Sequence, residues 1–337
     1  MTERERRRAE FLAGAGWATA QRHPLPSDAS FRSYHRLEDA GRRAMLMDAP
    51  PPQEDVRPFC RVASLLHRLD YSAPNILAAD IEGGFLLLED LGDGTYTRLL
   101  DRGADERALY GLAIDLLADL HARFDPAASH GLAEYDDRKL LDEAALLVDW
   151  FMPAASGSAV PDALRADYLG LWAAALPVAR SVPAGLVLRD YHIDNLMHLP
   201  DRTGLAACGL LDFQDAVIGP ISYDLISLIE DARRDVSPPL AEALWQRYLA
   251  ARPRIDPAAL RSSAAVIGAQ RHAKIVGIFC RLARRDGKPD YLKHLPRVWR
   301  LLQNSLDHPA LAPLAQWFDR HIPAASRGIP PIEGFRV

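Results

Sequence analysis

Short apolar runs separated by turn residues fill the first quarter of the chain, and this alternation predicts a small antiparallel sheet. Four runs read as strands: residues 31–37, 44–47, 76–79 and 85–88. A charged turn joins the first two runs, and Glu82-Gly83-Gly84 joins the last two, so the strands form two hairpins. Apolar residues recur at helical spacing over 55–69, between the hairpins, and a further helix is expected at 3–15.

Apolar residues recur at helical spacing through most of the remaining chain. The predicted helices span 105–124, 137–151, 162–179 and 219–229, and the chain is helical again from 260 onward. Strands followed by helices predict an α+β fold with two lobes. We place the boundary after Gly92, which gives lobes of residues 1–92 and 93–337.

The second lobe contains a stretch in which apolar runs enclose many polar groups. The run 186–188 leads into Arg189-Asp190-Tyr191-His192-Ile193-Asp194-Asn195. A turn at 201–204 then leads into a second apolar run, 205–211, which ends at Asp212-Phe213-Gln214. The pattern predicts a strand, an acidic loop, a short strand, a hairpin and a final strand.

This order is typical of a kinase phosphoryl-transfer site. Such an enzyme needs a carboxylate that orients or deprotonates the attacking hydroxyl, and oxygen ligands for magnesium on the nucleotide phosphates. The protein-kinase template is H-R-D-x-x-x-x-N followed by Asp-Phe-Gly. Here Asp190 is the predicted base, and Asn195 and Asp212 are the predicted magnesium ligands. Leu188 replaces the His of the template, and Gln214 replaces its Gly.

Two other interpretations compete with this one. Asp and Asn at strand ends also serve turns and helix caps, so either motif alone would be ambiguous. The pair Asp190-x-His192 also opens some metal-dependent phosphoesterase sites, which need further Asn and His clusters for a second metal. No Gly-Asn-His follows, and the later histidines are scattered. The two motifs together, joined by a hairpin of suitable length, favour the kinase.

The nucleotide-binding features of a kinase are only partly present. Ser27 and Ser30 lie in the segment expected over the phosphates, which lacks the usual glycines. Glu89 and Leu91 follow the last predicted strand of the first lobe, where the kinase hinge binds adenine through backbone groups.

The phosphate-binding lysine of a kinase is also missing. Lysine accounts for four of the 40 basic residues, and none precedes Lys139. Met47 falls near the position where that lysine is expected. We therefore expect Arg32 or Arg36, on the preceding strand, to bind phosphate; the alternative is a solvated strand face.

Candidate acceptor-binding residues lie in two places. His192 and Asp194 flank the predicted base on the same loop, and Gln214 follows the second predicted metal ligand. Gln270 and Arg271 belong to a cationic stripe within an otherwise apolar helix. That stripe would hold an anionic or polyhydroxylated substrate, or would pair with acidic residues between helices.

Composition narrows the class of protein. The 337 residues are 49% apolar and 25% charged, as in ordinary globular proteins, and the net charge of −5 argues against a nucleic-acid binder. No apolar segment is long enough for a membrane span, and no signal peptide is evident. Cys60, Cys208 and Cys280 lie far apart in mostly apolar settings, which predicts buried thiols and a cytoplasmic location.

With these residues in view, the chain resembles the aminoglycoside phosphotransferase superfamily of small-molecule kinases. Within it, the chain looks closest to the bacterial N-acetylmuramate/N-acetylglucosamine anomeric kinases. The resemblance rests on six segments: S-D-A-S-F-R (27–32), M-D-A-P-P (47–51), L-E-D-L-G (88–92), R-D-Y-H-I-D-N (189–195), L-D-F-Q-D (211–215) and the region from Q-R-H (270–272) to R-D-G (285–287).

The resemblance implies a protein-kinase-like fold with a nucleotide-binding lobe and a larger, mainly helical catalytic and substrate-binding lobe. It also implies ATP-dependent, magnesium-dependent phosphorylation of the C1 hydroxyl of an N-acetylated sugar, within peptidoglycan recycling. The expected partners are therefore small molecules, an amino sugar and ATP, and the oligomeric state stays open. An aminoglycoside or choline-type kinase would share the site but needs an acidic acceptor pocket. A non-catalytic nucleotide-binding scaffold would be expected to have lost Asp190 or Asp212.

Overall fold

The computed structural model describes residues 1–26, 31–128 and 131–331. The chain divides by packing into two compact units. The first unit comprises residues 1–116 and 193–215, and the second comprises 117–192 and 216–337. This division by packing does not test the predicted functional boundary at residue 92, which stays a prediction.

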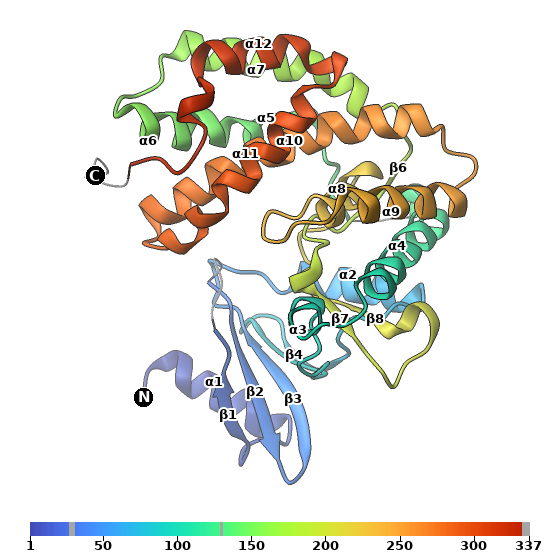
Figure 1. Cartoon of the computed structure of the whole chain (residues 1–337). Coiled ribbons are helices and arrows are strands. Elements are labelled where there is room, and N and C mark those ends of the chain that lie inside the picture. The colour runs from blue at the N-terminus through green and yellow to red at the C-terminus, as the bar shows by residue number, and fades with distance from the viewer. Residues whose placement is uncertain (27–30, 129–130, 332–337) are drawn as a thin grey trace. The chain divides into compact units, whose positions relative to one another are not determined.

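The first unit is built on a five-stranded antiparallel sheet in the described residues, with strand order β1-β2-β3-β5-β4 (Figure 1). The strands are β1 (Gln21–Pro24), β2 (Ser33–Asp39), β3 (Arg42–Asp48), β4 (Ile76–Asp80) and β5 (Phe85–Leu88). Helix α1 (Glu3–Gly14) contributes Leu12 to a small core with Leu37, Leu46 and Phe85 of the sheet.

The remaining elements of the first unit carry site residues. Helix α2 (Arg57–Arg68) follows β3, and α3 (Tyr96–Asp101) follows the loop after β5. Strands β7 (Leu196–His198) and β8 (Cys208–Leu210) form a separate antiparallel hairpin.

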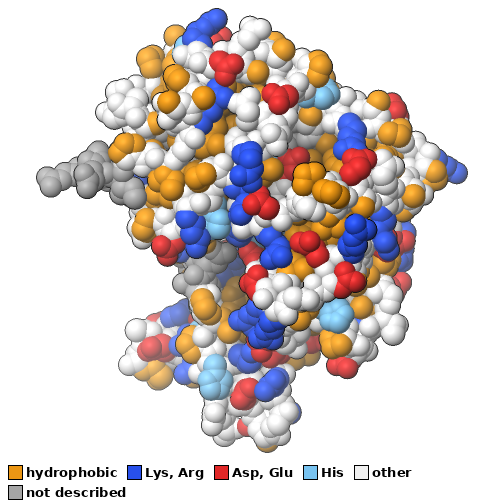
Figure 2. Space-filling view, viewed as in Figure 1, with side chains coloured by type: hydrophobic (Ala, Val, Ile, Leu, Met, Phe, Trp, Pro, Cys, Tyr) orange, Lys and Arg blue, Asp and Glu red, His pale blue; other side chains and the backbone are white. Residues whose placement is uncertain are grey.

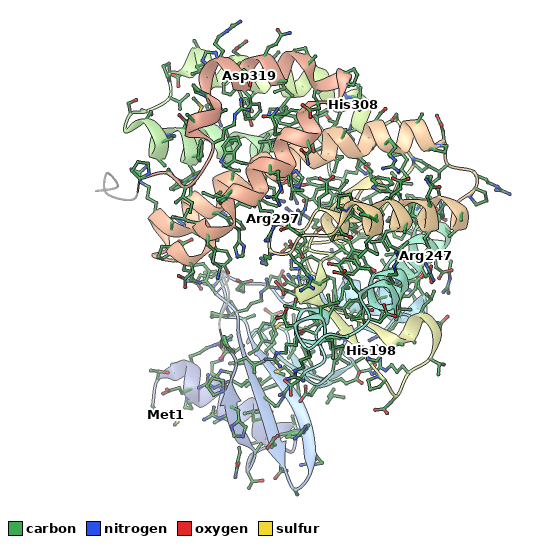
Figure 3. The ribbon with its side chains drawn as sticks, viewed as in Figure 1. Met1, His198, Arg247, Arg297, His308 and Asp319 are labelled. Atoms are coloured by element: carbon green, nitrogen blue, oxygen red, sulfur yellow. The ribbon has the colours of Figure 1, made fainter. Side chains whose placement is uncertain are left out.

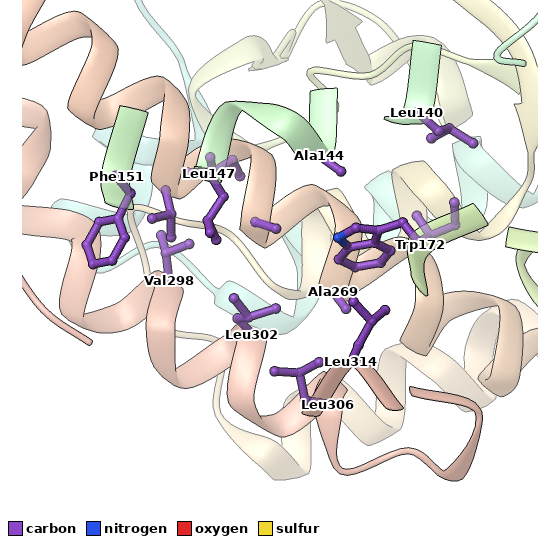
Figure 4. Close-up of a cluster of buried hydrophobic side chains, with 14 of the residues drawn as sticks. Leu140, Ala144, Leu147, Phe151, Trp172, Ala269, Val298, Leu302, Leu306 and Leu314 are labelled. Atoms are coloured by element: carbon purple, nitrogen blue, oxygen red, sulfur yellow. The ribbon is translucent and has the colours of Figure 1, made fainter. Parts of the chain in front are cut away.

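Helix α10 (Pro257–Arg285) lies at the centre of the second unit and packs on most of its other helices. Around it lie α5 (Asp137–Leu146), α7 (Asp162–Ala179), α8 (Ser222–Ile229), α9 (Pro238–Ala251), α11 (Leu295–Leu306) and α12 (Ala312–His321). Figure 4 shows part of the shared core, to which Trp172, Ala269 and Leu302 belong. Gly277 is required for this packing, because a Cβ there would lie 2.2 Å from the backbone carbon of Leu146.

Helix α5 does not continue to residue 151 as a regular helix. After Leu146 the backbone becomes a π-helical turn, Leu147–Phe151, and α6 (Met152–Ser156) follows. Helix α4 (Glu106–Arg123) runs across the division between the units, which falls after Leu116. Strands β6 (Ala184–Val187) and β9 (Val217–Pro220) form the second unit's antiparallel pair.

Two further sequence expectations need correction, and one strand was not predicted. The run 205–211 is not one strand: Gly204–Ala207 is a 3₁₀ turn and only Cys208–Leu210 is extended, because the hairpin pairs over three residues. The helix predicted at 219–229 begins at Ser222, since Gly219-Pro220 still belongs to β9. Strand β1 was not predicted because its four residues are all exposed and carry no apolar alternation.

The surface carries both signs of charge. Figure 2 shows Lys and Arg side chains interspersed with Asp and Glu side chains over the face in view. Across the residues that the structure describes, no helix is both long and apolar enough to span a bilayer.

Candidate active site

The β7–β8 hairpin brings the two predicted metal ligands to one end of the same element. Leu196 pairs with Leu210, so Asn195 immediately before β7 lies opposite Leu211 immediately after β8. The N–H of Leu211 donates to the carbonyl of Asn195 at 2.9 Å. Asn195 and Asp212 therefore sit beside each other at the hairpin end, although 16 residues separate them in the chain.

The hairpin is anchored to the segment that follows α2. The N–H of Leu210 donates to the carbonyl of Ser72 at 2.7 Å, and the hydroxyl of Ser72 donates to the carbonyl of Ala206 at 2.6 Å. Phe213, which is fully buried, stacks on Phe59 of α2 with ring centroids 4.8 Å apart. Burial of Phe213 next to Asp212 fixes where the chain turns after β8.

Asp212 has a left-handed backbone, with φ of 55°, which is uncommon for a residue with a side chain. The amide of Gln214 donates to Asp212 Oδ1 at 2.8 Å, and Arg32 Nη2 lies 3.6 Å from the same oxygen. Gln214 thus contacts a predicted metal ligand directly, and Arg32 supplies a positive charge beside it.

Arg32 lies between two acidic groups of the first unit. Its Nε is 3.7 Å from Glu54 Oε2, and its Nη2 is the group near Asp212. Burial alone would lower the pKa of Arg32, but Tyr34, Asp212 and Glu54 raise it overall, so the guanidinium stays charged. The pairing of Arg32 with Glu54, which precedes α2, is of the same charge type as the lysine–glutamate pair of a protein kinase. Sequence reasoning named Arg32 but missed Glu54.

Arg36 has different partners. It contacts Asp90 Oδ2 at 2.7 Å and Asp93 Oδ1 at 3.0 Å, and it donates to the carbonyl of Gly92 at 3.1 Å. These contacts tie β2 to the segment after β5. Its predicted phosphate contact remains a prediction.

The predicted hinge residues also have protein contacts. Glu89 donates its N–H to the carbonyl of Asn75 at 2.8 Å, and its carboxylate accepts from Asn75 and from Arg202. Leu91 Cδ1 would lie 3.2 Å from a Cβ at Gly209, so Leu91 covers the glycine of β8. Ser27 and Ser30 lie outside the described residues.

Asp194 is held by α3. The hydroxyl of Thr97 donates to Asp194 Oδ1, so this carboxylate is oriented within the first unit. The predicted sugar contact of Asp194 is not tested by this bond.

The predicted base, Asp190, belongs to the second unit and follows β6. The N–H groups of Leu188 and Arg189 donate to Asp224 at 2.6 and 2.9 Å. The N–H of Asp190 donates to the carbonyl of Leu188 at 2.9 Å, and that of His192 donates to the carbonyl of Asp190 at 3.1 Å. These bonds hold the loop in a tight turn with Asp190 at its centre.

Asp224 is the buried support of this loop. It is fully buried at the start of α8, and burial raises the pKa of its carboxyl to about 7, against the opposing effect of the two N–H donors. Asp224 is the third residue of α8 and does not cap it, because the N-cap is Ile221; its carboxylate instead accepts the two N–H groups of the catalytic loop.

His192 lies beside an arginine that the sequence did not single out. Its Nε2 is 3.5 Å from Arg233 Nη1, on the loop between α8 and α9. That loop is tethered to α11, because Arg297 (Figure 3) contacts Asp235 at 3.0 Å and donates to the carbonyl of Ala232 at 3.3 Å. No local motif marks Arg233, and only the fold places it near His192.

Gln270 and Arg271 lie inside the second unit. Gln270 is fully buried and donates to the carbonyl of Leu140 at 2.9 Å. Arg271 is 4% exposed and donates from Nη2 to Ser227 Oγ at 2.8 Å. Gln270 Oε1 and Arg271 Nη1 are buried polar atoms with no hydrogen-bond partner among the described residues.

Two polar groups near Arg271, one on α10 and one directly after α8, are affected by its charge. His272 Nε2 lies 3.5 Å from Glu230 Oε2, and His272 is fully buried. Burial and Arg271 lower the pKa of His272 to about 3, while burial raises the pKa of Glu230 to about 7. The imidazole is therefore neutral near pH 7, and this contact is not a salt bridge there.

The donor set at the hairpin end fits a magnesium ion. Asn195 supplies an amide oxygen and Asp212 a carboxylate, both hard ligands of the type that magnesium takes when nucleotide phosphates complete its shell. Within the described residues no group of three or more His, Cys, Asp or Glu side chains could hold a metal ion by itself.

Known proteins resemble the chain along most of its length. The profile of the phosphotransferase enzyme family (APH) matches residues 21–262. An N-acetylmuramate/N-acetylglucosamine kinase of Caulobacter vibrioides is 38% identical and covers 97% of this chain and 99% of its own. The kinase of the same name from Pseudomonas aeruginosa is also 38% identical, with 91% of each chain covered.

Solved structures share the fold at low identity. Choline kinase LicA from Streptococcus pneumoniae has a TM-score of 0.65 at 12% identity, covering 91% of this chain and all of its own. Aminoglycoside 2'-phosphotransferase-IIIa has a TM-score of 0.62 at 17% identity, covering 90% of this chain and 99% of its own. These similarities confirm the predicted protein-kinase-like α+β fold, and the family match confirms the predicted resemblance. The chain belongs to the phosphotransferase enzyme family.

Proposed function

We propose that this protein is an ATP-dependent kinase that phosphorylates the anomeric C1 hydroxyl of N-acetylmuramate, N-acetylglucosamine or both, in peptidoglycan recycling. Relatives of this name align with nearly the full chain. The observation that carries the proposal is the retained pair of motifs: Asp190 on a loop braced by Asp224, and Asn195 beside Asp212 at the end of a hairpin. We place the reaction in the cytoplasm, with ATP and an amino sugar as the partners.

Asp190 is the proposed base. Its carboxylate accepts the proton of the C1 hydroxyl as the sugar oxygen bonds to the γ-phosphorus of ATP. The bond from that phosphorus to the bridging oxygen breaks, and ADP leaves with the electron pair. The backbone bonds that hold Leu188 and Arg189 on Asp224 keep the carboxylate in one place before substrate arrives.

Asn195 and Asp212 are the proposed magnesium ligands. A bound magnesium ion would neutralise charge on the phosphate oxygens. Gln214 orients the Asp212 carboxylate through its amide. Arg32 is the proposed phosphate-binding cation: its contacts with Glu54 and Asp212 are longer than hydrogen bonds, so the guanidinium can exchange them for phosphate oxygens.

The acceptor contacts are proposed in the second unit and its loop. His192, two residues beyond the base, lies beside Arg233 of the loop between α8 and α9. Asp194 follows His192 on the same loop. Arg271 is the proposed partner of the lactyl carboxylate of N-acetylmuramate, because Nη1 is buried and has no partner among the described residues. Gln270 Oε1 is likewise buried without a hydrogen-bond partner among the described residues, and it would accept a hydrogen bond from a hydroxyl or amide of the sugar.

The function is tested by measuring ADP release with ATP, magnesium and a panel of acceptors. The panel comprises N-acetylmuramate, N-acetylglucosamine, choline and an aminoglycoside. We expect turnover only with the amino sugars, because arginines near the acceptor loop disfavour cationic acceptors. Turnover with choline or an aminoglycoside, and none with either sugar, would overturn the proposal.

A further inference from the structure

Arg189, the residue before the proposed base, adopts a backbone conformation that favours glycine. Its φ is 70°, in the left-handed region. Glycine would occupy this position without steric cost, whereas a side chain is strained there. Two of the other three non-glycine residues with positive φ, Ala40 and Asp70, lie in turns between elements. An arginine that tolerates this strain must be held by contacts of its own.

These contacts come from a set of largely buried polar side chains in the second unit, here called the Glu143 cluster. Its members are Glu143, Arg189, Lys274, Tyr135 and Tyr223. Arg189 Nη2 donates to Glu143 Oε1, and the guanidinium lies 5.5 Å from the centre of the Tyr135 ring. The Tyr135 hydroxyl donates to Glu143 Oε2. Lys274 Nζ lies 3.2 Å from Glu143 Oε2 and donates to the Tyr223 hydroxyl at 3.1 Å.

The backbone of Arg189 is held as firmly as its side chain. Its N–H donates to Asp224 Oδ1 at 2.9 Å, and its carbonyl accepts from Ser227 Oγ at 3.2 Å. Ser227 Oγ in turn accepts from Arg271 Nη2 at 2.8 Å. The N–H, the carbonyl and the guanidinium are thus fixed by three different side chains, on α5 and α8.

The cluster keeps its charges across the working pH range. Burial alone would raise the pKa of Glu143, but Lys274 and Arg189 hold it below its ordinary value. Burial alone would lower the pKa of Arg189, but Glu143, Tyr223 and Tyr135 hold it above its ordinary value. Since neither group titrates near neutral pH, the cluster acts through geometry and not as a proton switch.

We propose that Arg189 is a positioning residue, locked by the Glu143 cluster, that sets where the Asp190 carboxylate sits. The inference rests on the proposed function. Arg189 directly precedes Asp190, so a rotation at its φ or ψ moves the base. A glycine would allow that rotation, and the anchored arginine prevents it.

The test compares Arg189→Gly with Arg189→Ala. Arg189→Gly removes the strain and the anchor together, and Arg189→Ala removes the anchor and keeps the strain. We expect both to lower kcat about 10–100-fold, the effect of misplacing a catalytic group by about 1 Å, with KM for ATP nearly unchanged. Arg189→Lys, which can still reach Glu143, should retain more of kcat. A kcat for Arg189→Gly equal to that of wild type would overturn the proposal.

Glu143→Gln supplies the second arm. If Arg189 acts through Glu143, then adding Glu143→Gln to Arg189→Gly should lower kcat little further. Independent, multiplicative losses would contradict the lock. Arg165→Ala is the matched control, because Arg165 forms a comparable pair with Asp149 at 2.8 Å on the exposed surface of the same unit, and it should leave kcat unchanged.

Hydrogen exchange separates this proposal from the proposed function. The amides of Leu188, Arg189, Asp190 and His192 all donate within the loop or to Asp224, so they should exchange slowly. In Arg189→Gly and Glu143→Gln they should exchange at least about tenfold faster, while amides of β9 are unchanged. Unchanged loop exchange would refute the positioning role. Absence of sugar turnover in the wild-type enzyme would refute the function alone.

Discussion

Arg32→Ala tests whether an arginine replaces the missing phosphate lysine. Arg32 is held at 3.6 Å from Asp212 and 3.7 Å from Glu54, so no full hydrogen bond is broken when it turns to a phosphate oxygen. A hydrogen bond to a charged group contributes about 1.5–3 kcal/mol. The loss of one such bond should weaken ATP binding about 10–100-fold, at about 1.4 kcal/mol for each tenfold change.

The assay is calorimetric titration with ATP and with adenosine, in the presence of magnesium. Arg32→Ala should weaken ATP binding and leave adenosine binding unchanged, because adenosine has no phosphates. Arg42→Ala is the control. The partners of Arg42 are Asp39 and the Trp17 ring, whose centre lies 4.5 Å from its guanidinium, and neither belongs to the proposed site. If both variants weakened ATP binding equally and only slightly, Arg32 would not bind phosphate, and backbone groups and the metal ion would hold the triphosphate. An equal loss for adenosine would mean that Arg32 supports the fold.

Three further predictions follow from the site. Asp212→Ala should weaken ATP binding mainly when magnesium is present, and an equal loss in EDTA would contradict the ligand role. Arg271→Ala should lower kcat/KM for N-acetylmuramate more than for N-acetylglucosamine, whereas an equal loss with a lowered Tm would assign Arg271 to structure. Asp224→Asn should lower Tm by about 1–4 °C, because its amide leaves a buried N–H unpaired at about 1–3 kcal/mol. Because burial raises the pKa of Asp224 from 3.8 to about 7, its stabilising contribution is greatest below pH 4 and is lost as pH rises to about 7. Between about pH 4 and pH 7, Tm should therefore fall less with rising pH in Asp224→Asn than in the wild type. The same fall in both proteins would contradict this.

Elements with local signals were predictable from the sequence. The interval from Asp190 to Asn195 and the position of Asp212 specify a loop and a hairpin end without knowledge of the fold, because the spacing itself reflects strand pairing. The hydrophobic periodicity of α2 likewise gave a helix close to the observed Arg57–Arg68. Arg32 could be proposed only through the absence of lysine before Lys139.

Features that depend on long-range packing were not predictable. The Glu143 cluster joins Arg189 of the catalytic loop to residues of α5, α8, α10 and the segment before α5, and no local pattern marks those partners. Arg233 comes near His192 only because its loop is tethered to α11. Strand β1 is wholly exposed, so its pairing with β2 left no hydrophobic pattern to detect.

The central claim is that Asp190 activates the C1 hydroxyl of an amino sugar, and phosphorus NMR of the reaction product tests it most directly. With ATP, magnesium and N-acetylmuramate or N-acetylglucosamine, the account predicts a sugar phosphate whose phosphorus couples to the anomeric proton. Asp190→Asn should reduce its rate of formation by about 10²–10⁴-fold, while Asp201→Asn, in an exposed turn, should match the wild type. Phosphate on another hydroxyl, or Asp190→Asn within a few-fold of the wild-type rate, would contradict the account.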